Sequence, residues 1–158
     1  MVKEKKQAFT RRITQANKTQ LVVVVYEIFL VYLEDALEAY KTQNMNEFRQ
    51  NIAMARECIA HMRTSLDLEY QLARNLFSIY CFADRELAND YYGNKTDNLD
   101  AIRDIFTKLH DAYDTISKND DSKPLMDNIQ DVYAGLTYGK NDLNESLVNY
   151  DNKRGYLV

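Results

Sequence analysis

The stretch MNEFRQNIAMARECIAHMRTSL, residues 45–66, decides the fold that the sequence predicts. Its apolar side chains recur at alternating steps of four and three residues, at Phe48, Ile52, Ala55, Ile59, Met62 and Leu66. That spacing places them on one face of an α-helix and is typical of the seam of a helical bundle. Asn44 and Glu47 have the spacing of a capping box, so we expect this helix to begin next to them.

Three further segments have the same periodicity, which predicts a helix in each. The first covers residues 19–43, with apolar positions at Leu21, Val24 or Val25, Ile28, Tyr32, Ala36 and Ala39. The next, residues 67–92, repeats the pattern at Leu68, Leu72, Leu76, Ile79 and Ala83. The last, residues 99–116, repeats it at Leu99, Ile102, Phe106, Leu109, Tyr113 and Ile116. Four such helices with short connections predict an all-α fold, an antiparallel four-helix bundle.

The connections contain the residues that usually start and stop helices. Asp67 is the expected cap of the helix over residues 67–92, and Gly93 is expected just past its end. Thr96 or Asp97 is expected to cap the helix that follows. Asp121 or Ser122, before Pro124, predicts the start of a short fifth helix, with apolar positions at Leu125, Ile129, Val132 and Leu136.

The two ends of the chain differ from this middle part. Residues 1–17 are polar and basic, and we expect a flexible N-terminal arm with Phe9 and Ile13 as isolated apolar points. Residues 137–158 place scattered apolar side chains in a polar string, which predicts a weakly ordered tail. The predicted organisation is therefore an arm over residues 1–17, a helical domain over 18–136 and a tail over 137–158.

The composition excludes several classes of protein. A net charge of −4 argues against a nucleic-acid-binding protein, and one Pro with four Gly argues against a loop-built site. The apolar run LVVVVYEIFLVYL, residues 21–33, contains Glu27 and is shorter than the about 20 residues that a membrane span needs. Without a signal peptide, and with Cys58 and Cys81 outside any ligand spacing, the sequence predicts a cytoplasmic protein with reduced thiols.

No pattern in the sequence predicts catalysis or a cofactor. A di-iron bundle needs Glu-x-x-His motifs, but Cys58 stands three residues before His61, and Thr107 three residues before His110. Met62 beside His61 suits a packed core better than a haem ligand. The sequence also contains no motif of a phosphate-binding loop or a catalytic triad. We therefore expect neither an enzyme nor a metal or cofactor site.

A second apolar face on residues 67–92 indicates binding instead. Tyr70, Phe77 and Tyr80 lie beside the stripe that contains Leu72 and Leu76. This surplus has two interpretations, a middle helix packed between two neighbours or a groove for a partner's amphipathic helix. Asn75, within this apolar stretch, must find hydrogen bonds on neighbouring helices or on a bound chain.

Two segments resemble a known family, the flagellin-specific export chaperones called FliS. Residues 65–87, SLDLEYQLARNLFSIYCFADREL, are similar to its pattern of Leu-Asp-x-Glu-Tyr, Ala/Ser-x-Asn-Leu, Leu/Ile-Tyr and Arg-x-Leu. Residues 21–36, LVVVVYEIFLVYLEDA, are similar in placing Tyr26 after an apolar run. The resemblance covers roughly residues 7–118. The chain departs from the family in having NKTQL where Ser-Pro-Glu-Glu-Leu is usual, and in continuing past Pro124.

This resemblance implies a cytoplasmic, non-enzymatic helical bundle that holds the disordered C-terminal segment of flagellin. Such a chaperone prevents premature polymerisation and delivers flagellin to the flagellar type III export gate. The implied flagellin-binding residues are Ile52, Leu68, Leu72, Asn75, Leu76, Phe77 and Tyr80. Phe9 and Ile13 match the arm residues that cover a groove and help to dock at the export gate. The alternative is a four-helix adaptor or homodimeric scaffold that uses the same apolar surface.

Overall fold

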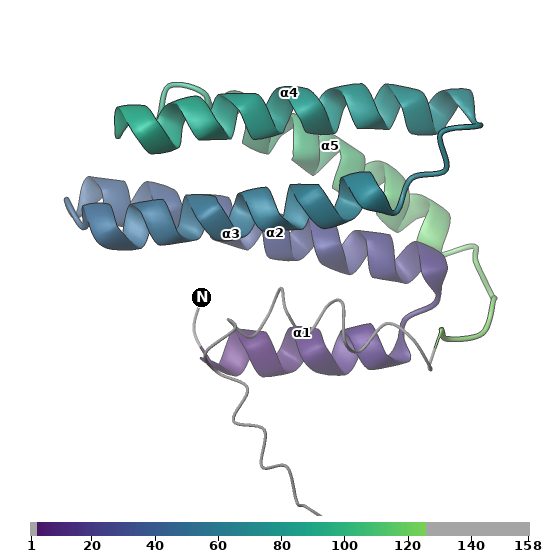
Figure 1. Ribbon diagram of the computed structural model, residues 1–158. Coiled ribbons are helices and arrows are strands. Elements are labelled where there is room, and N and C mark those ends of the chain that lie inside the picture. The colour runs from purple at the N-terminus through teal and green to yellow at the C-terminus, as the bar shows by residue number, and fades with distance from the viewer. Residues whose placement is uncertain (1–2, 126–158) are drawn as a thin grey trace, which may run out of the picture.

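The computed structural model describes residues 3–125, and helices are their only regular secondary structure (Figure 1). The helices are α1 (Lys3–Gln15), α2 (Lys18–Lys41), α3 (Met45–Thr64), α4 (Gln71–Gly93) and α5 (Leu99–Ser117). In Figure 1, α2 to α5 lie side by side with alternating directions, and α1 runs along the flank of α2. The predicted all-α four-helix bundle is therefore confirmed.

The α2 helix is the centre of the bundle. It packs extensively against both α3 and α5, whereas α4 packs chiefly on α3 and has only slight contact with α5. Each of the four bundle helices contributes large side chains that are fully buried. They are Tyr26, Phe29, Phe48, Phe106, Ile28, Leu33, Ile52, Ile59, Leu87, Leu99 and Ile102. Burial on several sides explains why the valine run of α2 forms a helix despite the modest helix propensity of valine.

The helices α2 and α3 each begin at an asparagine whose side chain caps the helix. Asn17 caps α2, because its Oδ1 accepts from the backbone N–H of Gln20 at 2.9 Å while the Gln20 side chain accepts from the Asn17 N–H at 3.1 Å. Asn44 caps α3, where its Oδ1 accepts from the Glu47 N–H at 3.3 Å. The cap predicted at Asn44 is thus confirmed, since each bond satisfies an N–H that has no partner within its helix.

The starts predicted for α4 and α5 are wrong. Asp67 accepts from the Glu69 N–H at 3.0 Å inside a turn, and α4 begins only at Gln71 with Tyr70 as an N-cap that makes no side-chain hydrogen bond. The α5 helix begins after Asn98 and not after the predicted caps at positions 96 and 97. A local turn competes with helix capping for the same short acidic side chain, which explains the shift at Asp67.

The end of α4 and the start of α5 are joined by a buried carboxylate. Asp90 is fully buried and accepts from the backbone N–H of Asn98 at 3.1 Å and from its Nδ2 at 2.9 Å. Burial raises the pKa of the Asp90 carboxyl, and the bonds from Asn98 lower it by less. The α4 helix includes Gly93, which was expected past its end, and Asn94 forms the left-handed C-cap with φ of 48°.

The N-terminal arm is more ordered than the sequence predicted. Lys3–Gln15 form α1, a regular helix whose Phe9 and Ile13 are buried, so these two residues are not the isolated apolar points that the sequence suggested. The reason is that Phe9 and Ile13 are one helical turn apart and form a small apolar face against α2. The start predicted for a fifth helix at Asp121 or Ser122 is wrong, because residues 121–125 are not helical. The rest of that predicted helix and the predicted tail lie outside the described residues.

Candidate binding site

An exposed apolar surface lies where the loop from α3 enters α4. Leu68, Tyr70 and Leu72, here called the apolar end surface, are 45%, 67% and 65% exposed. Leu72 lies one turn before Leu76 on the same face of α4, so this surface continues the buried stripe of the helix. In Figure 1 the first turns of α4 extend beyond the end of α3, which explains why the stripe is uncovered there.

A cavity of about 50 Å³ lies near this end of α4, since Leu66 and Leu76, which line it, are close in sequence to Leu68 and Leu72. Its walls come from α2, the end of α3 with the loop after it, α4 and α5, and consist of Val22, Val25, Met62, Ser65, Leu66, Leu76, Tyr80 and Tyr113. Of these, only Ser65 and the two tyrosines carry a polar side-chain group. The volume is enough for a small aliphatic group and too small for an aromatic ring.

Tyr80, which lines the cavity, is paired in the core with a second tyrosine, Tyr26. The hydroxyl oxygens of Tyr26 and Tyr80 lie 2.5 Å apart, and both side chains are buried. The Tyr26 ring packs edge-on against Phe106 and Tyr113, with ring centroids 5.9 and 5.6 Å away. Burial raises the pKa of Tyr26 and raises the pKa of Tyr80 to about 12, so both hydroxyls stay protonated at neutral pH.

The structure separates five of the seven predicted flagellin-binding residues into three groups. Leu68 and Leu72 are exposed on the apolar end surface, while Leu76 and Tyr80 are buried and line the cavity. Ile52 is fully buried in the core and is not accessible in this conformation. It points into the bundle because its seam on α3 faces α2, the most heavily covered helix.

The remaining two predicted residues lie elsewhere on α4. Asn75 is exposed, and its Oδ1 accepts from Gln71 Nε2 at 2.9 Å, so its hydrogen bond is local and not a contact with another helix. Phe77 is half-buried. The structure therefore brings together Leu68, Leu72, Leu76 and Tyr80 at one end of the bundle, and not Ile52.

Sequence reasoning missed the contributions of α2 and α5 to this end of the bundle. Val22 and Tyr113 line the cavity from these two helices. Only Tyr113 was named, as part of a packing stripe, because helical periodicity shows which residues share a face and not which four helix ends meet. The surplus of tyrosine, 12 in all, was the available signal, since a tyrosine with a polar hydroxyl suits a partly open site.

On the flank of the bundle, α1 is held by an ion pair as well as by apolar contact. Arg12 donates to both carboxylate oxygens of Glu27 on α2, with Nη2 2.8 Å from Oε1. His110 Nε2 of α5 lies 3.5 Å from the same Oε1. The bond to Glu27 raises the pKa of Arg12 further above its ordinary range.

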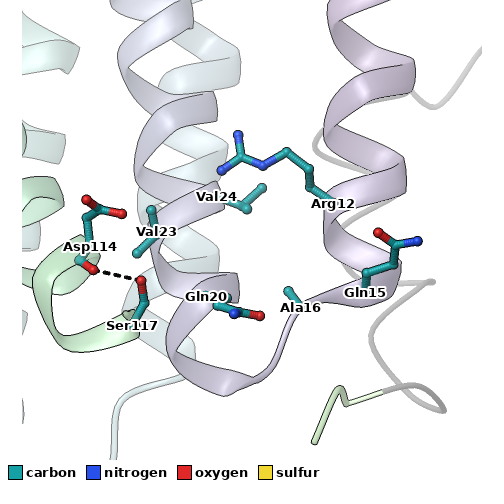
Figure 2. Close-up of a pocket in the computed structure, with 8 residues that line it drawn as sticks. All are labelled: Arg12, Gln15, Ala16, Gln20, Val23, Val24, Asp114 and Ser117. Atoms are coloured by element: carbon teal, nitrogen blue, oxygen red, sulfur yellow. Dashed lines mark hydrogen bonds between the residues drawn. The ribbon is translucent and has the colours of Figure 1, made fainter. Parts of the chain in front are cut away.

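A second cavity, of about 370 Å³, separates the C-terminal half of α1 from α5 (Figure 2). Its floor includes Val23 and Val24 of α2, and Figure 2 shows Arg12 on one side and Asp114 with Ser117 on the other. Ser117 Oγ donates to the Asp114 carbonyl at 2.8 Å. The C-terminal half of α1 is therefore incompletely packed on the bundle.

The described residues offer little for other chemistry. Within residues 3–125, no three His, Cys, Asp or Glu side chains gather into a group that could hold a metal ion. None of the helices in this range has a stretch long and apolar enough to cross a membrane. The features that remain are the apolar end surface, the cavity beside it and the face of α2 under α1.

These features define an all-helical bundle with an uncovered apolar surface and a helix packed along its flank. The family model described as flagellar protein FliS matches residues 1–120, so the chain belongs to the FliS family of flagellar chaperones. The predicted family membership is thus confirmed. A comparison with curated proteins found no match.

Proposed function

We propose that this protein binds the disordered C-terminal segment of flagellin in the cytoplasm, prevents its premature polymerisation and delivers it to the flagellar type III export gate. Membership of the FliS family supports the general role. The observation that carries the specific role is the apolar end surface, because Leu68, Tyr70 and Leu72 are three large apolar side chains that stay open to water next to the start of α4. Such surfaces on soluble proteins commonly mark interaction sites.

A helix-forming client suits this geometry. An amphipathic helix presents apolar side chains at steps of three and four residues, which matches a surface that extends one face of α4. One small aliphatic side chain of the client enters the cavity beside Leu76 and Tyr80, and others cover Leu68 and Leu72. A client that becomes ordered only on binding loses part of its interaction free energy to that ordering, so release at the export gate remains possible.

The α1 helix has a regulatory role in this proposal. Phe9 and Ile13 occupy an apolar face of α2 that the flagellin segment uses when it wraps around the bundle. While α1 is docked, that part of the surface is closed, so the apparent affinity for the client is lowered by the fraction of time in which α1 is closed. A released α1 presents Phe9 and Ile13 for docking at the export gate.

The experiment compares two substitutions on the same helix. Leu72→Asp places a carboxylate on the apolar end surface, and Tyr92→Asp places one on the other end of α4, where Tyr92 is 77% exposed. We expect Leu72→Asp to weaken binding of a flagellin C-terminal peptide by at least about tenfold, measured by calorimetric titration, since an unpaired charge must be desolvated. Tyr92→Asp should bind like the wild type.

A third variant tests the cavity. Val22→Leu adds one methylene to the cavity wall, and it should leave thermal stability equal or higher while it weakens client binding. If all three variants bind the peptide equally well, the client does not use this end of the bundle. Should wild type and Tyr92→Asp form dimers that Leu72→Asp does not, with no peptide binding, the surface serves a homodimeric scaffold instead.

A further inference from the structure

The link between α1 and α2 is held by a segment from the opposite end of the described chain. Only Ala16 and Asn17 join the two helices, and they are 5% and 2% exposed. In Figure 1 the segment after α5 turns back to this link. The backbone N–H of Leu125 donates to the Ala16 carbonyl at 3.1 Å, which gives a partner to a carbonyl just beyond the last turn of α1.

Asn17 uses both ends of its side-chain amide at this point. Its Oδ1 caps α2, as described above, and its Nδ2 donates to the backbone carbonyls of Asp120 at 2.9 Å and Ser122 at 3.3 Å. Because the side chain is buried, it cannot turn away without leaving polar groups unpaired. The direction in which α2 begins is thereby fixed to the position of the segment after α5.

A side-chain contact adds to these backbone bonds. Thr19 Oγ1 donates to Asp120 Oδ2, and the Ser122 N–H donates to Asp120 Oδ1 at 3.0 Å. The bonds from Ser122 and Thr19 hold the pKa of the Asp120 carboxyl below its ordinary range, so it is ionised at neutral pH. Asp120 therefore joins the turn after α5 to the first turn of α2.

Beyond the link, α1 is attached to the bundle by the Arg12–Glu27 ion pair and by one apolar face. Among the helices, its main contact is with α2 through a face that includes Phe9 and Ile13. The cavity of about 370 Å³ lies between its C-terminal half and α5. An element with one packed neighbour and a cavity beside it belongs to the parts of a protein that open most readily.

We propose that residues 120–125 form a hinge clasp, which holds the α1–α2 link and thereby sets how often α1 leaves the face of α2. Opening of the clasp frees the link to change its backbone dihedrals, and α1 then moves as a unit. The position of α1 thus depends on a segment that is more than 100 residues away in sequence. This inference goes beyond the proposed function and requires no client.

Hydrogen exchange of the full chain tests the clasp. Asp120→Ala removes the acceptor of the Thr19 and Ser122 bonds, so it should raise exchange of the α1 amides between positions 7 and 15 by roughly five- to tenfold, with α3 amides unchanged. Thr19→Val keeps the side-chain shape and removes only the donor, so it should give a smaller rise. The double variant should match Asp120→Ala, because both changes remove the same bond.

Asp121→Ala is the matched control, since it removes the neighbouring exposed carboxylate and should leave α1 exchange at the wild-type rate. The clasp is rejected if Asp120→Ala and Thr19→Val both exchange like the wild type in α1. It is also rejected if α3 amides accelerate by the same factor as α1 amides, because the whole bundle is then destabilised and not the hinge.

Discussion

The hydroxyl oxygens of Tyr26 and Tyr80 are 2.5 Å apart, which joins α2 directly to α4. This bond matters because α4 packs chiefly on α3 and only slightly on α5. The Tyr80 ring also stacks on Phe106 of α5, with centroids 6.0 Å apart. Tyr80 therefore fixes α4 to both α2 and α5 next to the cavity that we assign to the client.

The first prediction concerns this bond. Tyr26→Phe and Tyr80→Phe should each lower the free energy of unfolding by about 1–2 kcal/mol, since each leaves the partner hydroxyl buried and unpaired. The double variant should cost less than the sum, because it also removes the unpaired hydroxyl. Urea denaturation of the four proteins measures this, and strictly additive costs would show that the two hydroxyls do not interact.

A second prediction follows from the raised pKa of Tyr80, about 12 against an ordinary value of 10. The unfolded chain releases this proton at lower pH than the folded protein does. The stability that the protonated Tyr80 hydroxyl contributes is therefore fully present below pH 10 and is lost as the pH rises from about 10 to 12. Denaturation at several alkaline pH values should show a steeper loss for the wild type than for Tyr26→Phe/Tyr80→Phe, and parallel losses would contradict it.

A third prediction concerns the start of α5. Asp90→Ala should lower the free energy of unfolding by about 1–3 kcal/mol, because the partly buried backbone N–H of Asn98 loses its acceptor. Asp97→Ala, which removes an exposed carboxylate at the position that the sequence suggested as a cap, should change it by less than about 0.5 kcal/mol. The opposite order of effects in thermal denaturation would restore Asp97 as the cap.

A fourth prediction concerns α1 as a competitor of the client. Phe9→Ala should weaken docking of α1 on α2 and so raise the apparent affinity for a flagellin C-terminal peptide. The rise is at most tenfold for each 1.4 kcal/mol by which the docking free energy of α1 is weakened. Gln7→Ala, on the exposed face of α1, is the control and should bind like the wild type. Fluorescence titration compares them, and unchanged affinity for Phe9→Ala means that α1 does not cover the client surface.

The sequence predicted the helices better than their ends. The spacing of Phe48, Ile52 and Ile59 was sufficient for the bundle, because a regular apolar stripe has one stable solution, burial against other helices. The cap at Asn44 was also predictable, since it bonds within three residues. Asp90 was not predicted, because its partner lies eight residues away in the next helix and only tertiary packing brings them together.

The candidate site could be predicted only in part. Helical spacing placed Leu68, Leu72 and Leu76 on one face, but it could not show that the first two lie beyond the covered part of α4. Helical spacing placed Ile52 in the bundle seam, whereas the family resemblance placed it among the client-binding residues, and in this structure it lies in the core. The family resemblance suggested a client, and the exposed side chains decide which part of α4 is open to one.

The central claim is that the apolar end surface binds the C-terminal segment of flagellin. The most direct test is titration of the full chain with a peptide of about 40 residues from the cognate flagellin C-terminus, followed by circular dichroism and by the mass of the complex. We predict a saturable complex of one peptide per chain with a gain of helix, and a marked loss of both in Leu72→Asp. No complex and no gain of helix with the wild type would contradict the account.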